Sequence, residues 1–162
     1  MSRTVILVRH AKTGDGEPDI DRALTPRGHA DAAAIGRALA ANDVTPDRVV
    51  VSPARRAQET WSDAARELPA GAAPAVVEDD RIYDNDEDLL LEIVRETPDD
   101  IDTLVLVGHN PSFGGLALRL GSPEVRRDGF PTAACAGFEI TGSWAGFEPH
   151  AATPYWFVVA RA

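Results

Sequence analysis

The chain has 162 residues, of which 44% are hydrophobic and 26% charged, and its formal net charge is −10 at pH 7. These proportions are typical of soluble globular proteins and exclude collagen-like, disordered and disulfide-scaffold chains. The length predicts one domain spanning residues 1–162. The acidity disfavours nucleic acid as a partner, because counterion release requires a basic face. No run approaches the roughly 20 apolar residues of a membrane span, so no membrane association is expected.

A single cysteine, Cys135, excludes an internal disulfide and favours a reducing compartment. The apolar run Val5–Val8 is followed at once by Arg9, which makes it too short for a signal peptide. We therefore predict a cytoplasmic protein. Fifteen of the sixteen cationic residues are arginine and only Lys12 is lysine, a bias that base composition can explain.

The first expected strand is Thr4–Val8, and a polar loop follows over residues 11–24. Thr25 has the pattern of a helix N-cap, with Pro26 at the first helical position. The predicted helix continues to about Ala41.

A second strand, Arg48–Val51, runs into Ser52-Pro53. We interpret this pair as another N-cap and first-turn proline, opening a helix to about Leu68. A weaker strand is expected at Ala75–Glu78, after a turn near residues 71–74.

Asp84 and Glu87 have the spacing of a capping box, which predicts a helix N-terminus at Asp84. Leu90 and Ile93 then lie on the apolar face of this helix, and Pro98 ends it.

The run Thr103–Val107 is apolar throughout, as expected of a strand buried on both faces, and we place it near the centre of the sheet. The alternation of strands and helices predicts an α/β protein: a three-layer α/β/α sandwich with a mostly parallel central sheet. The remaining expected elements are a helix opened by Asn110-Pro111 and ending near Leu120, and strands near Ala136–Ile140 and Tyr155–Ala160.

Polar residues stand where three of these strands end: Arg9-His10, Ser52-Pro53 and His109-Asn110. In open α/β sheets, ligands bind outside the carboxyl ends of the strands. Helix N-termini at that edge present free N–H groups and a positive dipole, which suit an anion.

Taken alone, each of these residues can be explained by a structural role or by surface exposure. A histidine at a strand end is as often structural as catalytic, and the pair Arg55-Arg56 is typical of a helix surface. Together with Arg9, however, they bring guanidinium groups, which bind phosphate oxygens bidentately, to the same edge as two imidazoles. A neutral histidine can attack phosphorus. The four histidines and Cys135 lack metal-ligand spacing, so neither a metal nor another cofactor is expected.

Three segments, in this order, resemble the motifs of the histidine phosphatase superfamily. Residues 7–13 are similar to its Arg-His-Gly signature, residues 52–60 to its Ser-Pro-x-x-Arg-Ala-x-x-Thr motif, and residues 107–110 to its second-histidine motif. The loop at residues 19–28 and the short length resemble the branch of SixA-type phosphohistidine phosphatases. The resemblance implies a phosphoglycerate mutase-like fold.

The resemblance also implies roles for particular residues. His10 would be the nucleophile that is phosphorylated, and Arg9, Arg56 and His109 would hold the phosphoryl oxygens. Thr13 matches a hydroxyl that often adds a contact. Ala11 stands where the family usually has glycine, a replacement that would be strained only at positive φ.

Three functions remain open at this point. The first is a metal-independent phosphatase for phosphohistidine on a protein, and the second a phosphomonoesterase for a small metabolite or nucleotide. The third is a phosphate-binding regulatory module without turnover. The second requires a general acid, and Asp84 lies roughly where larger superfamily members place one. As a helix cap, Asp84 would leave the protein without a dedicated acid, which favours N–P bonds and activated esters.

Overall fold

The computed structural model describes residues 2–162, which form a sheet of six strands in the order β3-β2-β4-β1-β5-β6. β1 pairs in parallel with β4, β4 with β2, and β2 with β3, whereas β5 runs antiparallel to both β1 and β6. β5 is thus the only reversed strand, which confirms the mostly parallel sheet and the near-central place of β4. The strands are β1 (Arg3–Arg9), β2 (Arg48–Val51), β3 (Ala75–Glu78), β4 (Thr103–Gly108), β5 (Ala134–Ile140) and β6 (Ala152–Val159).

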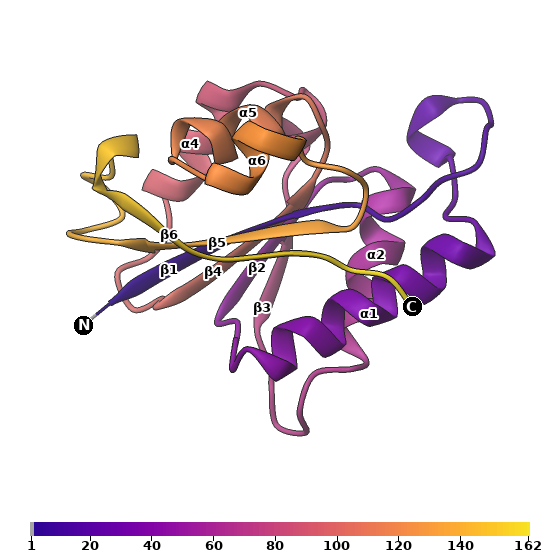
Figure 1. Ribbon diagram of the computed structural model, residues 1–162, viewed down its shortest axis with the longest axis horizontal. Coiled ribbons are helices and arrows are strands. Elements are labelled where there is room, and N and C mark those ends of the chain that lie inside the picture. The colour runs from indigo at the N-terminus through magenta and orange to yellow at the C-terminus, as the bar shows by residue number, and fades with distance from the viewer. Residues whose placement is uncertain (1) are drawn as a thin grey trace.

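Helices cover both faces of the sheet and complete the predicted three-layer sandwich (Figure 1). One face carries α1 (Pro26–Ala41) and α2 (Arg55–Ala65), and the other carries α4 (Glu87–Arg95), α5 (Ser112–Arg119) and α6 (Pro123–Asp128). Short turns of helix lie between them: η1 (Asp19–Asp21), α3 (Asp80–Tyr83) and η2 (Pro149–Ala151). Among the described residues, no helix is long and apolar enough to cross a membrane.

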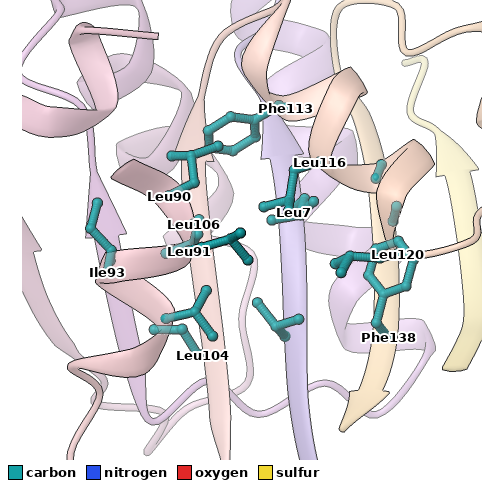
Figure 2. Packing of buried hydrophobic residues seen from close by; sticks show 14 of the residues in the cluster. Leu7, Leu90, Leu91, Ile93, Leu104, Leu106, Phe113, Leu116, Leu120 and Phe138 are labelled. Atoms are coloured by element: carbon teal, nitrogen blue, oxygen red, sulfur yellow. The ribbon is translucent and has the colours of Figure 1, made fainter. Parts of the chain in front are cut away.

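Alternate residues of the strands enter two separate apolar cores, because successive side chains of a strand point to opposite faces. In β1, Val5 and Leu7 pack under α4 and α5, while Ile6 and Val8 pack against α1 and α2. Figure 2 shows the first core, where Leu7 meets leucines of α4 and α5. Burial on both faces fixes the register of β1 and therefore the position of the residues that follow it.

The predicted start of α1 is confirmed. Thr25 Oγ1 accepts a hydrogen bond from the N–H of Gly28 at 3.0 Å, and Pro26 occupies the first helical position. Asn110 also satisfies a helix N-terminus as expected, since its Oδ1 accepts from the N–H of Gly114 in α5 at 3.0 Å.

Two other helix starts were predicted wrongly. α2 begins at Arg55 with Ala54 at its N-cap, and Ser52 directly follows β2. The Ser52 hydroxyl contacts another side chain and accepts from the N–H of Ala54 at 3.2 Å, ahead of the helix. α4 begins at Glu87 with Asp86 as its N-cap, and Asp86 Oδ1 accepts from the N–H of Asp88 at 2.8 Å.

Asp84 is therefore not the N-cap of α4 but the C-cap of α3, directly after Tyr83. Asn85 adopts a φ of 63°, a left-handed conformation that asparagine tolerates better than most residues. This conformation ends α3 before α4 begins, and it leaves the Asp84 carboxyl exposed.

Candidate active site

The pairing of β1 with β4 brings the two strand-end histidines together. Arg9 lies opposite Gly108 in the register, and the N–H of His10 donates to the Gly108 carbonyl at 3.0 Å. The rings of His10 and His109 then lie 5.3 Å apart, centroid to centroid, at the carboxyl edge of the sheet. Gly108 is required here, because a Cβ would lie 2.4 Å from the Phe113 ring.

His10 is held in one tautomer. Its Nδ1 lies 2.7 Å from the carbonyl oxygen of Ala11. A carbonyl only accepts, so Nδ1 carries the hydrogen and Nε2 keeps a lone pair. Burial is the main cause that lowers the pKa of His10 to about 4, and the charges of Arg9 and Arg56 add to it. His10 is therefore neutral near pH 7 and has a nucleophilic nitrogen.

The backbone turn that carries this carbonyl is fixed by Thr60 of α2. The N–H of Ala11 donates to Thr60 Oγ1 at 3.0 Å, and that hydroxyl donates to the Arg56 carbonyl at 2.7 Å. Ala11 is not among the residues with positive φ, so alanine replaces the family's usual glycine without backbone strain.

His109 has one bonded and one unbonded nitrogen. Nε2 lies 2.7 Å from Ser52 Oγ, whereas Nδ1 is buried without a hydrogen-bond partner among residues 2–162. Burial, followed by the neighbouring His10, lowers the pKa of His109 to about 3. When the Ser52 hydroxyl donates to Nε2, the neutral ring carries its hydrogen on Nδ1, which is then free to bond an anionic oxygen.

Two arginines add unpaired donors to the same edge. The Nε atoms of Arg9 and Arg56 are both buried with no hydrogen-bond partner in the described part of the chain. Arg9 is held from behind by the Phe130 carbonyl, which accepts from its Nη1 at 3.1 Å. Arg55 differs, since its side chain is 57% exposed and pairs with Glu59. The burial of Arg56 and the exposure of Arg55 agree with the motif position assigned to Arg56.

A carboxylate from η1 lies against Arg56. Asp19 accepts from Arg56 Nη2 at 3.1 Å through Oδ2, and its carbonyl accepts from Nη1 at 2.9 Å. The hydroxyl of Tyr83 donates to the same Oδ2 at 2.6 Å, and Arg22 Nε donates to Oδ1 at 3.0 Å. The Tyr83 bond is the largest cause that lowers the pKa of Asp19 to about 2, so this carboxylate is ionised at neutral pH.

The comparison with known proteins can now be set beside this geometry. The model of the histidine phosphatase superfamily, branch 1, matches residues 5–110, the segment that contains both strand-end histidines and Arg56. The chain belongs to the histidine phosphatase superfamily.

Relatives extend the similarity over nearly the whole chain. An uncharacterised protein of Mycobacterium tuberculosis is 34% identical over 164 aligned residues, covering 95% of this chain and all of that protein. A structure from Nakamurella multipartitia assigned as phosphohistidine phosphatase SixA superposes with a TM-score of 0.85 at 29% identity, over 100% of this chain and 98% of that one. A structure from Agrobacterium tumefaciens that carries the same assignment superposes with a TM-score of 0.78 at 26% identity, over 96% of this chain and 97% of that one. The predicted phosphoglycerate mutase-like fold is confirmed.

Two further residues singled out from the sequence lie close to this histidine phosphatase site. Thr13 Oγ1 accepts from Arg22 Nη1 at 3.0 Å, so its hydroxyl belongs to the loop network that includes Asp19. Asp84 is exposed between Tyr83, whose ring lies 5.9 Å from that of His109, and Asn85, whose side chain bonds the Asn110 carbonyl.

Sequence reasoning missed Ser52, Asp19 and Tyr83 as site residues. Ser52 was taken for a helix cap, although its place at a strand end was itself a signal. Asp19 and Tyr83 lie in very short helical turns, which show no periodicity, and nothing in the sequence indicates that they meet at Arg56. Across residues 2–162, no cluster of three or more histidine, cysteine or carboxylate side chains could hold a metal ion.

Proposed function

We propose that this chain is a phosphatase that transfers a phosphoryl group to His10 and then to water, with phosphohistidine on a protein as its preferred substrate. The observation that carries the proposal is the bond from His10 Nδ1 to the Ala11 carbonyl, which leaves Nε2 unprotonated beside His109. The relationship to SixA structures supports the substrate class.

In the first step, His10 Nε2 attacks phosphorus, an N–P bond forms, and the bond to the leaving group breaks. In the second step, water attacks the phosphohistidine, the N–P bond breaks, and phosphate is released with His10 restored. Negative charge is spread over the phosphoryl oxygens throughout. Arg9 and Arg56, with their unpaired Nε donors, and His109 Nδ1 would stabilise that charge.

The leaving group decides which substrates react. The imidazole of a phosphohistidine leaves readily, since a free histidine side chain has a pKa of about 6.5, whereas an alcohol must be protonated. Asp19 cannot supply that proton, because its contacts keep it ionised. Because imidazole leaves without prior protonation, the proposed enzyme needs no dedicated acid for phosphohistidine.

Rapid quench with a labelled phosphohistidine protein tests this proposal. We expect an acid-labile, base-stable phosphoenzyme that is absent from His10→Ala and present in His150→Ala, because His150 is exposed in η2 and far along the chain from the site. A labelled intermediate that persists in His10→Ala would overturn the assignment of the nucleophile.

One observation favours a second function, a phosphomonoesterase for small metabolites. Asp86, not Asp84, caps α4, so helix capping does not occupy the Asp84 carboxyl, which lies exposed next to Tyr83 at the edge of the site. Asp84→Asn separates the two functions. If the parent enzyme cleaves alkyl phosphates efficiently and Asp84→Asn abolishes only that activity, Asp84 is the acid. If alkyl phosphates are poor substrates of both forms and phosphohistidine hydrolysis is unchanged, the metabolite phosphatase is excluded.

A further inference from the structure

A second group of cations surrounds a surface hollow beside the candidate active site. The hollow has a volume of about 440 Å³ and is lined by Lys12, Arg27, Asp31, Thr132 and Arg161. Its three cationic residues come from the loop after β1, the first turn of α1 and the segment after β6. No sequence pattern groups these residues, because they are up to 149 residues apart.

The buried carboxylate of Asp31 holds several residues around this hollow. Its side chain is only 4% exposed, and its carboxylate accepts from Arg27 Nε at 3.1 and 3.2 Å and from the N–H of Ala162 at 2.9 Å. Arg161 Nη1 lies 3.8 Å from the same carboxylate and donates to the Thr132 and Ala160 carbonyls. One buried carboxylate thus positions the guanidinium groups of two arginines.

These contacts leave donors directed to solvent unused. Arg27 binds Asp31 through Nε alone, and no hydrogen bond in the described residues involves either of its Nη atoms. Lys12 is exposed and forms no ion pair within residues 2–162. Three cations against one acid give the hollow a local charge of about +2, in a chain whose net charge is −10. Fixed guanidinium groups with free donors are suited to carboxylate and phosphate.

The hollow adjoins the residues that would carry out the phosphoryl transfer. Lys12 follows His10 by two residues, so their Cα atoms are within roughly 7 Å of each other. On the other side, the N–H of Ala133, next to Thr132, donates to the His10 carbonyl at 3.1 Å. If the phosphoryl group of a peptide substrate lies at His10, a side chain one or two residues away in the extended peptide lies on the side of the hollow.

We propose that this hollow binds a second anionic group of the phosphorylated substrate, either a carboxylate or a phosphate. The inference rests on the proposed function, because it takes the group on His10 as the first anchor. It deepens that function by defining the substrate as doubly anionic near the reacting phosphoryl group. In an acidic protein, such a local cationic site also offsets the repulsion of an anionic substrate.

The first arm of the test uses two phosphohistidine peptides of identical sequence, except that the residues flanking the phosphohistidine are glutamate in one and glutamine in the other. The parent enzyme should have the higher kcat/KM for the glutamate peptide at low salt. Lys12→Glu should lower the ratio of the two kcat/KM values about tenfold, whereas Lys12→Arg should retain it. Within residues 2–162, Lys12 forms hydrogen bonds through its backbone carbonyl and none through its side chain, so these substitutions break no side-chain contact there.

Arg126→Glu is the matched control, since it changes the net charge equally at an exposed position of α6, on the other face of the sheet (Figure 1). It should leave the ratio at the parent value. A second arm compares a sugar bisphosphate with its monophosphate. If Lys12→Glu removes only the preference for the bisphosphate, the hollow binds a second phosphate. If it removes only the preference for the glutamate peptide, the hollow binds carboxylates.

Binding of the same two peptides to His10→Ala separates this inference from the proposed function. If the parent enzyme turns over neither peptide but His10→Ala binds the glutamate peptide more tightly, and Lys12→Glu added to it removes the preference, the phosphatase proposal fails and the hollow stands. If turnover is normal and Lys12→Glu leaves the ratio unchanged in both arms, the hollow is not an anion site.

Discussion

The two flanks of the carboxyl edge hold their cations in opposite ways. On the flank formed by η1 and α3, Arg56 and Arg22 are bonded to Asp19, which also accepts from Tyr83. On the flank formed by Lys12 and α1, the Lys12 ammonium group has no partner in the described residues, and Arg27 bonds Asp31 through Nε alone. The total charge of a region therefore says little about its affinity for an anion. What matters is how many donors the protein itself has already used.

The largest effect should come from breaking the bonded flank at Arg56. Removing a charged group from a desolvated site typically costs roughly 2–5 kcal/mol, which is about 1.5 to 3.7 powers of ten in rate. We expect Arg56→Ala to lose this much in kcat/KM, while Arg55→Ala, which removes only an exposed ion pair, loses less than about fivefold. Steady-state rates on a phosphohistidine protein measure both. Equal losses would show that the motif arginine has been misplaced.

Ser52→Ala should have the next largest effect. It removes the partner of His109 Nε2 and allows the ring to place its hydrogen on either nitrogen. Loss of a bond to a buried group costs about 1–3 kcal/mol, or roughly 5- to 150-fold in kcat/KM. Nitrogen NMR should detect the change of tautomer. Ser112→Ala is the control, because that hydroxyl bonds the His109 carbonyl and not its ring. An unchanged tautomer in Ser52→Ala would refute this role.

The two site histidines should also make the fold sensitive to mild acid. Both have folded-state pKa values, about 4 and about 3, below the usual 6.5 of an unfolded histidine. The unfolded chain therefore binds more protons below pH 6.5, and the free energy of unfolding falls as the pH drops from about 6.5 towards 4. Each histidine contributes roughly 1.4 kcal/mol per pH unit in this window.

Urea denaturation between pH 7 and 4.5 measures this slope. His10→Gln should reduce it by the share of one histidine. The lowered pKa of Asp19, about 2, acts at lower pH, where its contribution to stability is lost. A slope that is the same in the parent and in His10→Gln would show that burial does not hold His10 neutral.

The smallest effect should come from the carboxylate of the bonded flank. Asp19 is 53% exposed, so its interaction with Arg56 is worth at most about 1 kcal/mol. Asp19→Asn removes a negative charge that opposes phosphate, and inorganic phosphate should then inhibit up to about fivefold more tightly. Asp21→Asn should not change the inhibition constant, because the side chain of this neighbour forms no hydrogen bond or ion pair in the described residues. Weaker inhibition in Asp19→Asn would mean that Asp19 orients Arg56 for binding.

Much of this fold was predictable, because the local sequence patterns match the places of the same residues in the folded sheet. The continuous apolar run of β4 indicated a central strand, and the polar residues after β1 and β4 indicated the edge where His10 and His109 meet. Ser52 misled the prediction, because Ser-Pro satisfies the rules for a helix cap. Its actual partner, His109, is close in space but 57 residues away in the sequence. Asp84 misled it because Asp86 offers an equivalent cap.

The bonded flank and the hollow were beyond sequence reasoning for a different physical reason. Their members meet only through the sheet topology: Asp19 reaches Arg56 across 37 residues and Tyr83 across 64. Turns of three or four residues, such as η1 and α3, form no periodic pattern. Such contacts have no local signature, so only the folded chain shows them.

The direction of β1 bears on how the protein can be immobilised or labelled. β1 runs for seven residues from Arg3 to Arg9, so a tag joined ahead of it lies roughly 20 Å from the catalytic edge. The other end of the chain lies beside α1 (Figure 1). There the N–H of Ala162 bonds Asp31, and Arg161 lines the hollow. A surface or fusion partner attached there would crowd the approach of a phosphoprotein, whereas attachment through the other end leaves the whole edge accessible.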